Sequence, residues 1–190
     1  MKKLICFGKL KDNFGGFAKN ETDYSLLFEN DSLNLSFVSY DKNIFSKGKS
    51  YNDKLYEGDT VEIFITLGKR NKYLELEVNP DGVQYAGVVE NNNGQLNITY
   101  LPASPFFSRV DKKHDCWDCY MTIPIANLQR LGFQKDNAYF NLFRQDYDED
   151  KLNLYALNPT NKSTFHDLDS FVKLEIHIAN QERQKQNSIT

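Results

Sequence analysis

The chain has 190 residues, of which 40% are hydrophobic and 26% charged, and its formal net charge is -3. This length supports one domain with a full core and is short for two. The weakly acidic charge gives no basic field that would attract nucleic acid, and no apolar run approaches the roughly 20 residues of a membrane-spanning helix. We therefore expect one domain over residues 1–178 and a polar tail over residues 179–190, which lacks an apolar period.

Alternation of apolar and polar residues predicts short β-strands along the chain. We expect them at residues 24–29, 33–39, 60–67, 72–79, 83–89, 96–100, 117–123, 138–146, 152–157 and 171–178. Turns rich in Asn, Asp and Gly separate several of them, so neighbouring strands should pair antiparallel. One short helix is expected at residues 124–131, because Pro124 suits a first helical position and Gly132 a stop. The predicted fold class is all-β, an antiparallel sandwich with about ten strands and one helix.

Three glutamates lie within the expected hairpin of residues 60–67 and 72–79. If the apolar side chains of both strands face inward, Glu62, Glu75 and Glu77 share the opposite side with Phe64. Like charges on neighbouring strands are destabilising, and a cation, a base or a hydroxyl-bearing ligand would offset them. A solvated outer face, a ligand slot and a pair of glycosidase-like catalytic acids all remain open at this point.

The three cysteines, Cys6, Cys116 and Cys119, are an odd number, which argues against a disulfide framework and favours a reducing compartment. His114 beside Cys116 and Cys119 is compatible with zinc or redox chemistry, but a structural zinc site needs a second pair of ligands. We expect a buried Cys119 and a near-surface Cys116 instead. Because the start of the chain lacks the apolar centre of a secretory signal, a cytoplasmic location is expected, or an extracellular one if a signal was removed.

An acidic run lies at residues 146–150, in a predicted loop. Carboxylate oxygens suit calcium, so Asp146, Asp148 and Asp150 are candidate metal ligands. The spacing does not match an EF-hand loop, and a solvated acidic loop is the alternative. His166, which follows Phe165, is expected to be a hydrogen-bonded structural histidine.

Several motifs follow one another in order between residues 14 and 178. They are Glu21-Thr22, the hairpin from Leu26 to Phe37, Asp59-Thr-Val-Glu-Ile-Phe, Tyr73-Leu-Glu-Leu-Glu-Val-Asn-Pro-Asp-Gly, Trp117, Thr122-Ile-Pro-Ile, Asn141-Leu-Phe-Arg-Gln-Asp, Tyr155-Ala-Leu-Asn-Pro-Thr and Phe165-His166. In this order they resemble the family 9 carbohydrate-binding modules and their DOMON-like relatives. The resemblance implies an immunoglobulin-like, jelly-roll type of antiparallel β-sandwich. It also implies non-catalytic binding of oligosaccharides or polysaccharides, such as cello- or xylo-type sugars, and structural calcium in some members.

The resemblance also implies the residues of a sugar slot. By position, Tyr56 and Tyr155 correspond to the two rings that stack on the sugar. The hydroxyl partners implied by the resemblance are Glu62, Glu77, Arg144, Gln145 and Asn158, whereas Glu75 is expected to be ordinary surface.

This sequence departs from the family pattern at the stacking positions. Both carry Tyr instead of Trp, and Trp117, the only Trp, lies in a strand whose alternation points it inward. Haem, which some DOMON-like sandwiches bind through Met and His, is not expected because the only methionines are Met1 and Met121. The alternative function is a structural or protein-interaction sandwich that has lost the sugar slot.

Overall fold

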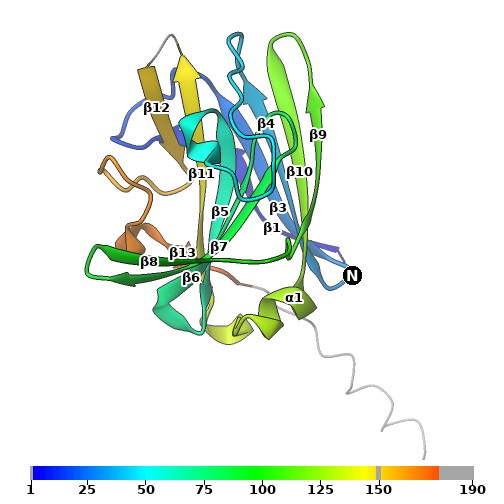
Figure 1. Cartoon of the computed structure of the whole chain (residues 1–190), viewed down its shortest axis with the longest axis vertical. Helices are drawn as coiled ribbons and strands as arrows, with labels where there is room; N and C mark the ends of the chain where they lie inside the picture. The colour runs from blue at the N-terminus through cyan, green and yellow to red at the C-terminus, as the bar shows by residue number, and fades with distance from the viewer. Residues whose placement is uncertain (1, 149–150, 176–190) are drawn as a thin grey trace, which may run out of the picture.

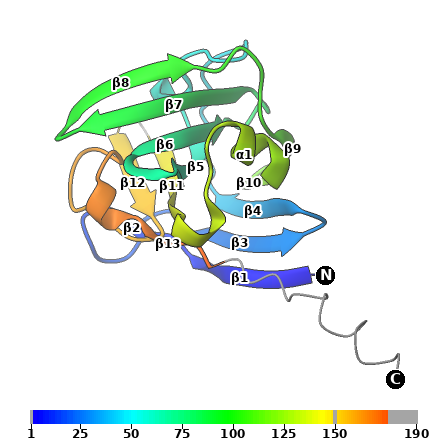
Figure 2. The same cartoon turned by 90° about the horizontal axis from the view of Figure 1, so that it is seen from below.

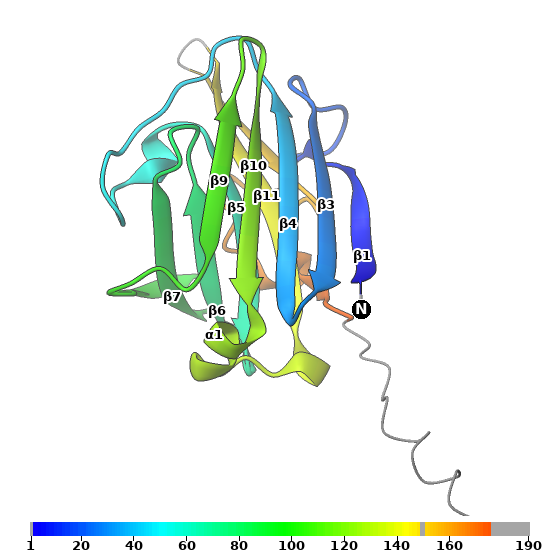
Figure 3. The same ribbon diagram turned by 90° about the vertical axis from the view of Figure 1, so that its right-hand side faces the viewer.

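The computed structural model describes residues 2–148 and 151–175, which form two antiparallel β-sheets packed face to face (Figure 1). The smaller sheet, seen face on in Figure 3, contains in spatial order β1 (Lys2–Lys9), β3 (Thr22–Glu29), β4 (Ser32–Tyr40), β10 (Cys116–Pro124) and β9 (Phe107–Lys112). The larger sheet contains in spatial order β2 (Lys11–Asp12), β12 (Lys151–Ala156), β11 (Tyr139–Asp148), β5 (Thr60–Leu67), β6 (Lys69–Val78), β7 (Gln84–Asn92) and β8 (Gln95–Tyr100), and β13 (Val172–Lys173) pairs with β11. The predicted antiparallel sandwich is confirmed.

The core between the sheets contains the apolar side of the predicted hairpin. β5 and β6 pair antiparallel, and their inward residues are all fully buried: Val61, Ile63, Ile65, Leu74, Leu76 and Val78. Trp117 is also fully buried and points inward from β10, as its alternation predicts. Each fully buried aliphatic side chain contributes about 1.5–3 kcal/mol, so this hairpin anchors the larger sheet.

Two of the longer strands, β1 and β9, were not predicted from the sequence. β1 has a register shift between Leu4 and Cys6 where it pairs with β3, and such a bulge interrupts the period-2 pattern. β9 is a polar strand at the edge of the smaller sheet, with only partly buried or exposed side chains. Neither strand therefore shows the alternation of a half-buried strand.

The larger sheet also carries apolar side chains on the face away from the core. There Phe64, Tyr73 and Phe143 form a second hydrophobic cluster with Phe165 and Phe171. The last two belong to residues 157–171, which we call the cover segment. Figure 2 shows it, in orange, on the side of β11 and β12 that faces away from β3 and β4. The cover segment therefore shields this part of the outer face of the larger sheet from solvent.

The predicted helix is present as α1 (Ile125–Arg130), at one end of the sandwich, and Gly132 follows it with a positive φ of 100°. Three short 3-10 turns lie at Leu55–Glu57, Lys135–Asn137 and Leu168–Ser170. None of the helices within the described ranges is long and apolar enough to cross a membrane. The predicted tail, residues 179–190, lies outside the described residues, as does the end of the strand expected at 171–178.

Candidate functional site

The three glutamates of the β5–β6 hairpin converge on the outer face of the larger sheet. Glu62 lies directly opposite Glu77 across the two strands, and Glu75 lies opposite Phe64. Carboxylate oxygens of Glu62, Glu75 and Glu77, which we call the glutamate triad, all lie within 4.8 Å of one another. The side chains are only 2%, 6% and 3% exposed, respectively. The predicted shared face is confirmed, but Glu75 is not ordinary surface, because the cover segment encloses it with the other two.

Burial controls the protonation of the glutamate triad. Removal from water raises the pKa of Glu62 to about 7, although hydrogen bonds from Gln145 and Thr60 act in the opposite direction. Burial, and then the negative charge of Glu62, raises the pKa of Glu75 well above its usual range. The same two causes and the charge of Glu75 raise the pKa of Glu77. Without a cation nearby, burial therefore favours the protonated forms of the triad.

Hydrogen bonds reach only part of the glutamate triad. Glu62 Oε1 accepts from Thr60 Oγ1 at 2.8 Å and from Gln145 Nε2 at 3.0 Å. The Oε2 atoms of Glu75 and Glu77 are buried and have no hydrogen-bond partner among the described residues. A buried carboxylate oxygen without a donor is costly, so these two atoms mark the place where a ligand would be stabilised.

A pocket of about 170 Å³ opens above the glutamate triad. Besides the three glutamates, its lining consists of Tyr56, Phe64, Gln145, Leu152, Leu154, Ser163, Thr164, Phe165 and His166. We call it the Glu62 pocket. Tyr56 lies on the 3-10 turn Leu55–Glu57 and is 47% exposed, whereas its neighbour Leu55 is fully buried and fixes the turn. The pocket thus combines an exposed aromatic ring, a carboxylate floor and a polar rim.

Aromatic contacts hold the cover segment over the pocket. The rings of Phe143 and Phe165 are stacked with their centroids 4.2 Å apart, and His166 is stacked on Phe64 at 5.4 Å. The ring Nδ1 of His166 is hydrogen-bonded to Tyr73 Oη at 2.7 Å. Burial lowers the pKa of His166 to about 4, so this histidine is neutral at pH 7. The expected structural histidine is found, and it also lines the pocket.

Four of the seven residues expected in the sugar slot lie together. Tyr56, Glu62, Glu77 and Gln145 all line the Glu62 pocket. Phe64, Ser163 and Thr164 also line the pocket, although the sequence did not mark them as ligand residues, and Glu75, which was expected at the surface, belongs to the pocket floor. The alternation along β6 already puts Glu75 on the same face as Glu77. The cover-segment residues carry no such signal, because the segment has no apolar period.

The structure corrects the expected positions of Arg144 and Tyr155. Arg144 lies opposite Val61 and Tyr155 lies opposite Arg144, so both point to the inner face of the sheet, and both are fully buried. Neighbouring residues of a strand point to opposite faces, so Arg144 and Gln145 cannot both line one slot. Tyr155 cannot stack on a sugar in the pocket that contains Tyr56.

Asn158 also lies elsewhere. Its side chain donates to the Ser170 carbonyl at 2.9 Å, and its backbone N–H donates to Asn141 Oδ1 at 3.1 Å. It lines a separate cavity of about 360 Å³ beside Leu4 and Val172. Its role here is to fix the cover segment to β11.

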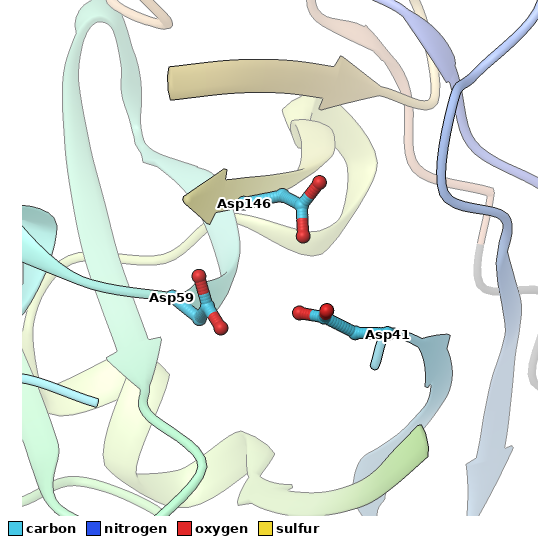
Figure 4. Close-up of side chains that lie close together, drawn as sticks. All are labelled: Asp41, Asp59 and Asp146. Atoms are coloured by element: carbon cyan, nitrogen blue, oxygen red, sulfur yellow. The ribbon is translucent and has the colours of Figure 1, made fainter. Parts of the chain in front are cut away.

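Arg144 belongs instead to a buried cluster of aspartates on the inner face. Carboxylate oxygens of Asp41, Asp59 and Asp146, which we call the aspartate triad, lie within 4.8 Å of one another and come from three separate segments (Figure 4). Arg144 Nη2 donates to Asp146 Oδ1 at 2.6 Å and to Asp41 Oδ2 at 3.2 Å. The guanidinium therefore supplies positive charge inside the triad.

The other carboxylate oxygens of the aspartate triad are also hydrogen-bonded. Asp59 accepts from the backbone N–H groups of Tyr147 and Phe45, both at 2.7 Å. Asp41 Oδ1 accepts from the backbone N–H of Asn43 at 2.7 Å. Asp146 Oδ2 accepts from Tyr155 Oη at 3.1 Å and from Asn20 at 3.0 Å. Burial and the neighbouring acids raise the pKa of Asp59 to about 7. Arg144 and these donors therefore already satisfy the carboxylate oxygens of the aspartate triad.

The metal ligands expected from the acidic run are likewise engaged in other contacts. Asp148 pairs with Lys19, and its other oxygen accepts from Asn43 Nδ2 at 3.0 Å. Asp150 lies outside the described residues. Cys119 is fully buried, as expected, which raises the pKa of its thiol. Cys116 is also buried, with only 8% of its surface exposed, so the near-surface position expected for it is wrong. All three cysteines are free, as expected.

No protein-family model matches this sequence, and no curated protein matches it. Solved structures do match. A proposed carbohydrate-binding protein from Bacteroides uniformis ATCC 8492 aligns with a TM-score of 0.70 at 15% identity, over 88% of this chain and 84% of its own. A family 9 carbohydrate-binding module from Caldicellulosiruptor kristjanssonii in complex with glucose aligns with a TM-score of 0.62 at 13% identity, over 91% and 87% of the two chains.

The chain has the family 9 carbohydrate-binding module fold. A further family 9 module from Caldicellulosiruptor kristjanssonii, in complex with cellotriose, aligns with a TM-score of 0.56 at 13% identity, over 81% of this chain and 73% of its own. The resemblance predicted from the ordered motifs is thus confirmed at the level of the fold. Within this family 9 fold, the glutamate triad and the aspartate triad lie on opposite faces of one sheet.

Proposed function

We propose that this chain is a non-catalytic carbohydrate-binding protein and that the Glu62 pocket is its sugar site. The observation that carries the proposal is the pairing of a half-exposed ring, Tyr56, with the acceptors Glu62, Glu75 and Glu77 at the floor of one pocket. The C–H face of a pyranose packs on an aromatic ring, and its hydroxyls need acceptors and donors. The fold, shared with modules in complex with glucose and cellotriose, supports the same conclusion.

The arrangement of the acids supports binding without hydrolysis. Glycosidases place two carboxyl groups on either side of the scissile bond. Here all three glutamates come from two adjacent strands and lie on one floor, so they would approach a sugar from the same side. A protonated acid and an ionised base cannot flank a glycosidic bond in this geometry.

Isothermal titration calorimetry of the purified chain with cellotriose, xylotriose and a broader glycan panel tests the proposal. Tyr56→Ala should weaken sugar binding by roughly two- to tenfold, since an aromatic contact contributes about 0.5–1.5 kcal/mol. Tyr120→Ala is the matched control, because Tyr120 is 46% exposed on β10 of the other sheet. Absence of binding to every glycan, with Tyr56→Ala indistinguishable from the control, would overturn the proposal and favour the protein-interaction alternative.

A further inference from the structure

The Glu62 pocket brings three acidic side chains together without a basic partner. Its floor holds three carboxyl groups, and none of the lysines or arginines that the structure describes lines it. The histidine in the lining, His166, is bonded through Nδ1 to Tyr73. The buried acids on the other face of the sheet have Arg144 as a partner. Among the described buried acid clusters, the glutamate triad is therefore the one without an internal cation.

The glutamate triad has carboxyl oxygens that lack a hydrogen-bond donor, and when ionised it would accept further hydrogen bonds. Glu75 and Glu77 line the pocket, and their buried Oε2 atoms accept no hydrogen bond from the described residues. A sugar hydroxyl donates one hydrogen and brings no charge, whereas a primary ammonium donates three hydrogens and brings the missing positive charge. Charge-assisted hydrogen bonds are also roughly twice as strong as neutral ones. An ammonium group therefore matches the three acids better than any neutral hydroxyl.

The size and walls of the pocket favour an organic cation over a bare metal ion. Its volume of about 170 Å³ equals roughly five or six waters at about 30 Å³ each, which is the scale of one sugar residue. Tyr56, Phe64 and Phe165 provide aromatic faces, which attract both C–H groups and cations. Calcium takes six to eight oxygen ligands, and Gln145 presents its amide N–H, not its oxygen, to Glu62.

We propose that the preferred ligand of the Glu62 pocket is an amino sugar with a free amine, whose ammonium group lies on the glutamate triad. This inference rests on the proposed function, since it names the class of sugar that the same pocket takes. The ring of the sugar packs against Tyr56, and the ammonium donates to the Oε2 atoms of Glu75 and Glu77. A cationic ligand then lets the triad ionise on binding.

Calorimetry with three trisaccharides of similar shape tests the inference: the glucosamine trimer, its N-acetylated counterpart and cellotriose. The titrations are run in amine-free buffer near pH 6, where primary amines are protonated. The glucosamine trimer should bind at least about tenfold more tightly than the other two, which corresponds to about 1.4 kcal/mol. In the double variant Glu75→Gln/Glu77→Gln this ratio should fall to about one. Glu90→Gln, at a half-exposed glutamate of β7 that pairs with Lys72, should keep the ratio of the unmodified chain.

The remaining outcomes separate the two proposals. Equal binding of the three sugars would overturn the amine preference and leave the proposed function standing. No binding of any sugar in this set or in the broader panel would overturn both. Saturable binding of calcium or zinc chloride that is lost in the double variant would also overturn the inference, because the triad would then be a metal site. A single Glu62→Gln variant repeats the comparison if the double variant fails to fold.

Discussion

Replacing Glu62 by glutamine should reduce the loss of stability that accompanies a rise in pH from about 5 to about 8. A free glutamate loses its proton near 4.5, whereas burial raises the pKa of Glu62 to about 7 in the folded chain. Between these values the folded state holds the proton and the unfolded state does not. The contribution of Glu62 to the free energy of unfolding is therefore fully present below about pH 4.5 and is lost as the pH rises toward 7. The gap corresponds to about 3 kcal/mol at 1.36 kcal/mol per pH unit.

Glutamine keeps the shape of the side chain and can still accept from Thr60 and Gln145. It also removes the charge that helps to raise the pKa of Glu75 and Glu77. Two other groups titrate nearby in the same range: Asp59, with its pKa raised to about 7, and His166, with its pKa lowered to about 4. Asp59 and His166 are present in both the unmodified chain and Glu62→Gln, so their contributions to the pH dependence cancel when the two proteins are compared.

Urea denaturation at about pH 5 and pH 8 measures this effect. Between these two pH values the unmodified chain should lose roughly 2–3 kcal/mol more stability than Glu62→Gln. Glu90→Gln, at a half-exposed residue of β7, should follow the unmodified chain. Parallel pH profiles for Glu62→Gln and the unmodified chain would refute the assignment of Glu62 as a buried acid whose pKa is raised on folding.

Three further outcomes follow from the inner face of the larger sheet. Arg144→Ala should lower the free energy of unfolding, measured by urea denaturation, by about 3–5 kcal/mol, because it leaves Asp41 and Asp146 buried without their cation. A loss no larger than that of the control Arg130→Ala, at an exposed residue of α1, would contradict this. Tyr155→Phe should lower the free energy of unfolding by about 1–2 kcal/mol, because it removes the hydrogen bonds of Tyr155 Oη with Asp146 and Asn20. A fall in sugar affinity in this variant would contradict the position of Tyr155 on the inner face. Chelation with EDTA should leave the melting temperature unchanged, because Arg144 supplies the charge inside the aspartate triad, and a lower melting temperature would indicate a bound metal.

The sequence predicts the floor of the candidate site well, because alternation along a strand decides which side chains share a face. Glu62 and Glu77 were placed together on that ground, and the register of β5 and β6 puts them opposite each other. The same reasoning applied to β11 separates Arg144 from Gln145. Assigning both to one slot was an error that the strand pattern alone could have prevented.

The walls of the site could not be predicted in this way. Ser163, Thr164 and Phe165 come from a segment without regular structure, and their place over β5 and β6 depends on stacking between side chains far apart in the chain. Nothing local in the sequence records such contacts. The burial of Glu75 follows from the same segment, which is why the alternation gave its face correctly but not its exposure.

The cover segment and the strand register divide the pocket into two parts with different freedom to change. A slip of one residue between β5 and β6 would turn the carboxyl groups of one strand, either Glu62 or the pair Glu75 and Glu77, into the hydrophobic core, so the floor can be altered only by substitution at fixed positions. Ser163 and Thr164 lie on the exposed stretch 161–164, between Thr160, which is buried and hydrogen-bonded to Asn13, and Phe165, which stacks on Phe143 of β11. Insertions or substitutions between these two attachments would reshape the opening while the sandwich stays intact. Protein engineering aimed at a new ligand should therefore begin with this stretch and leave the hairpin untouched.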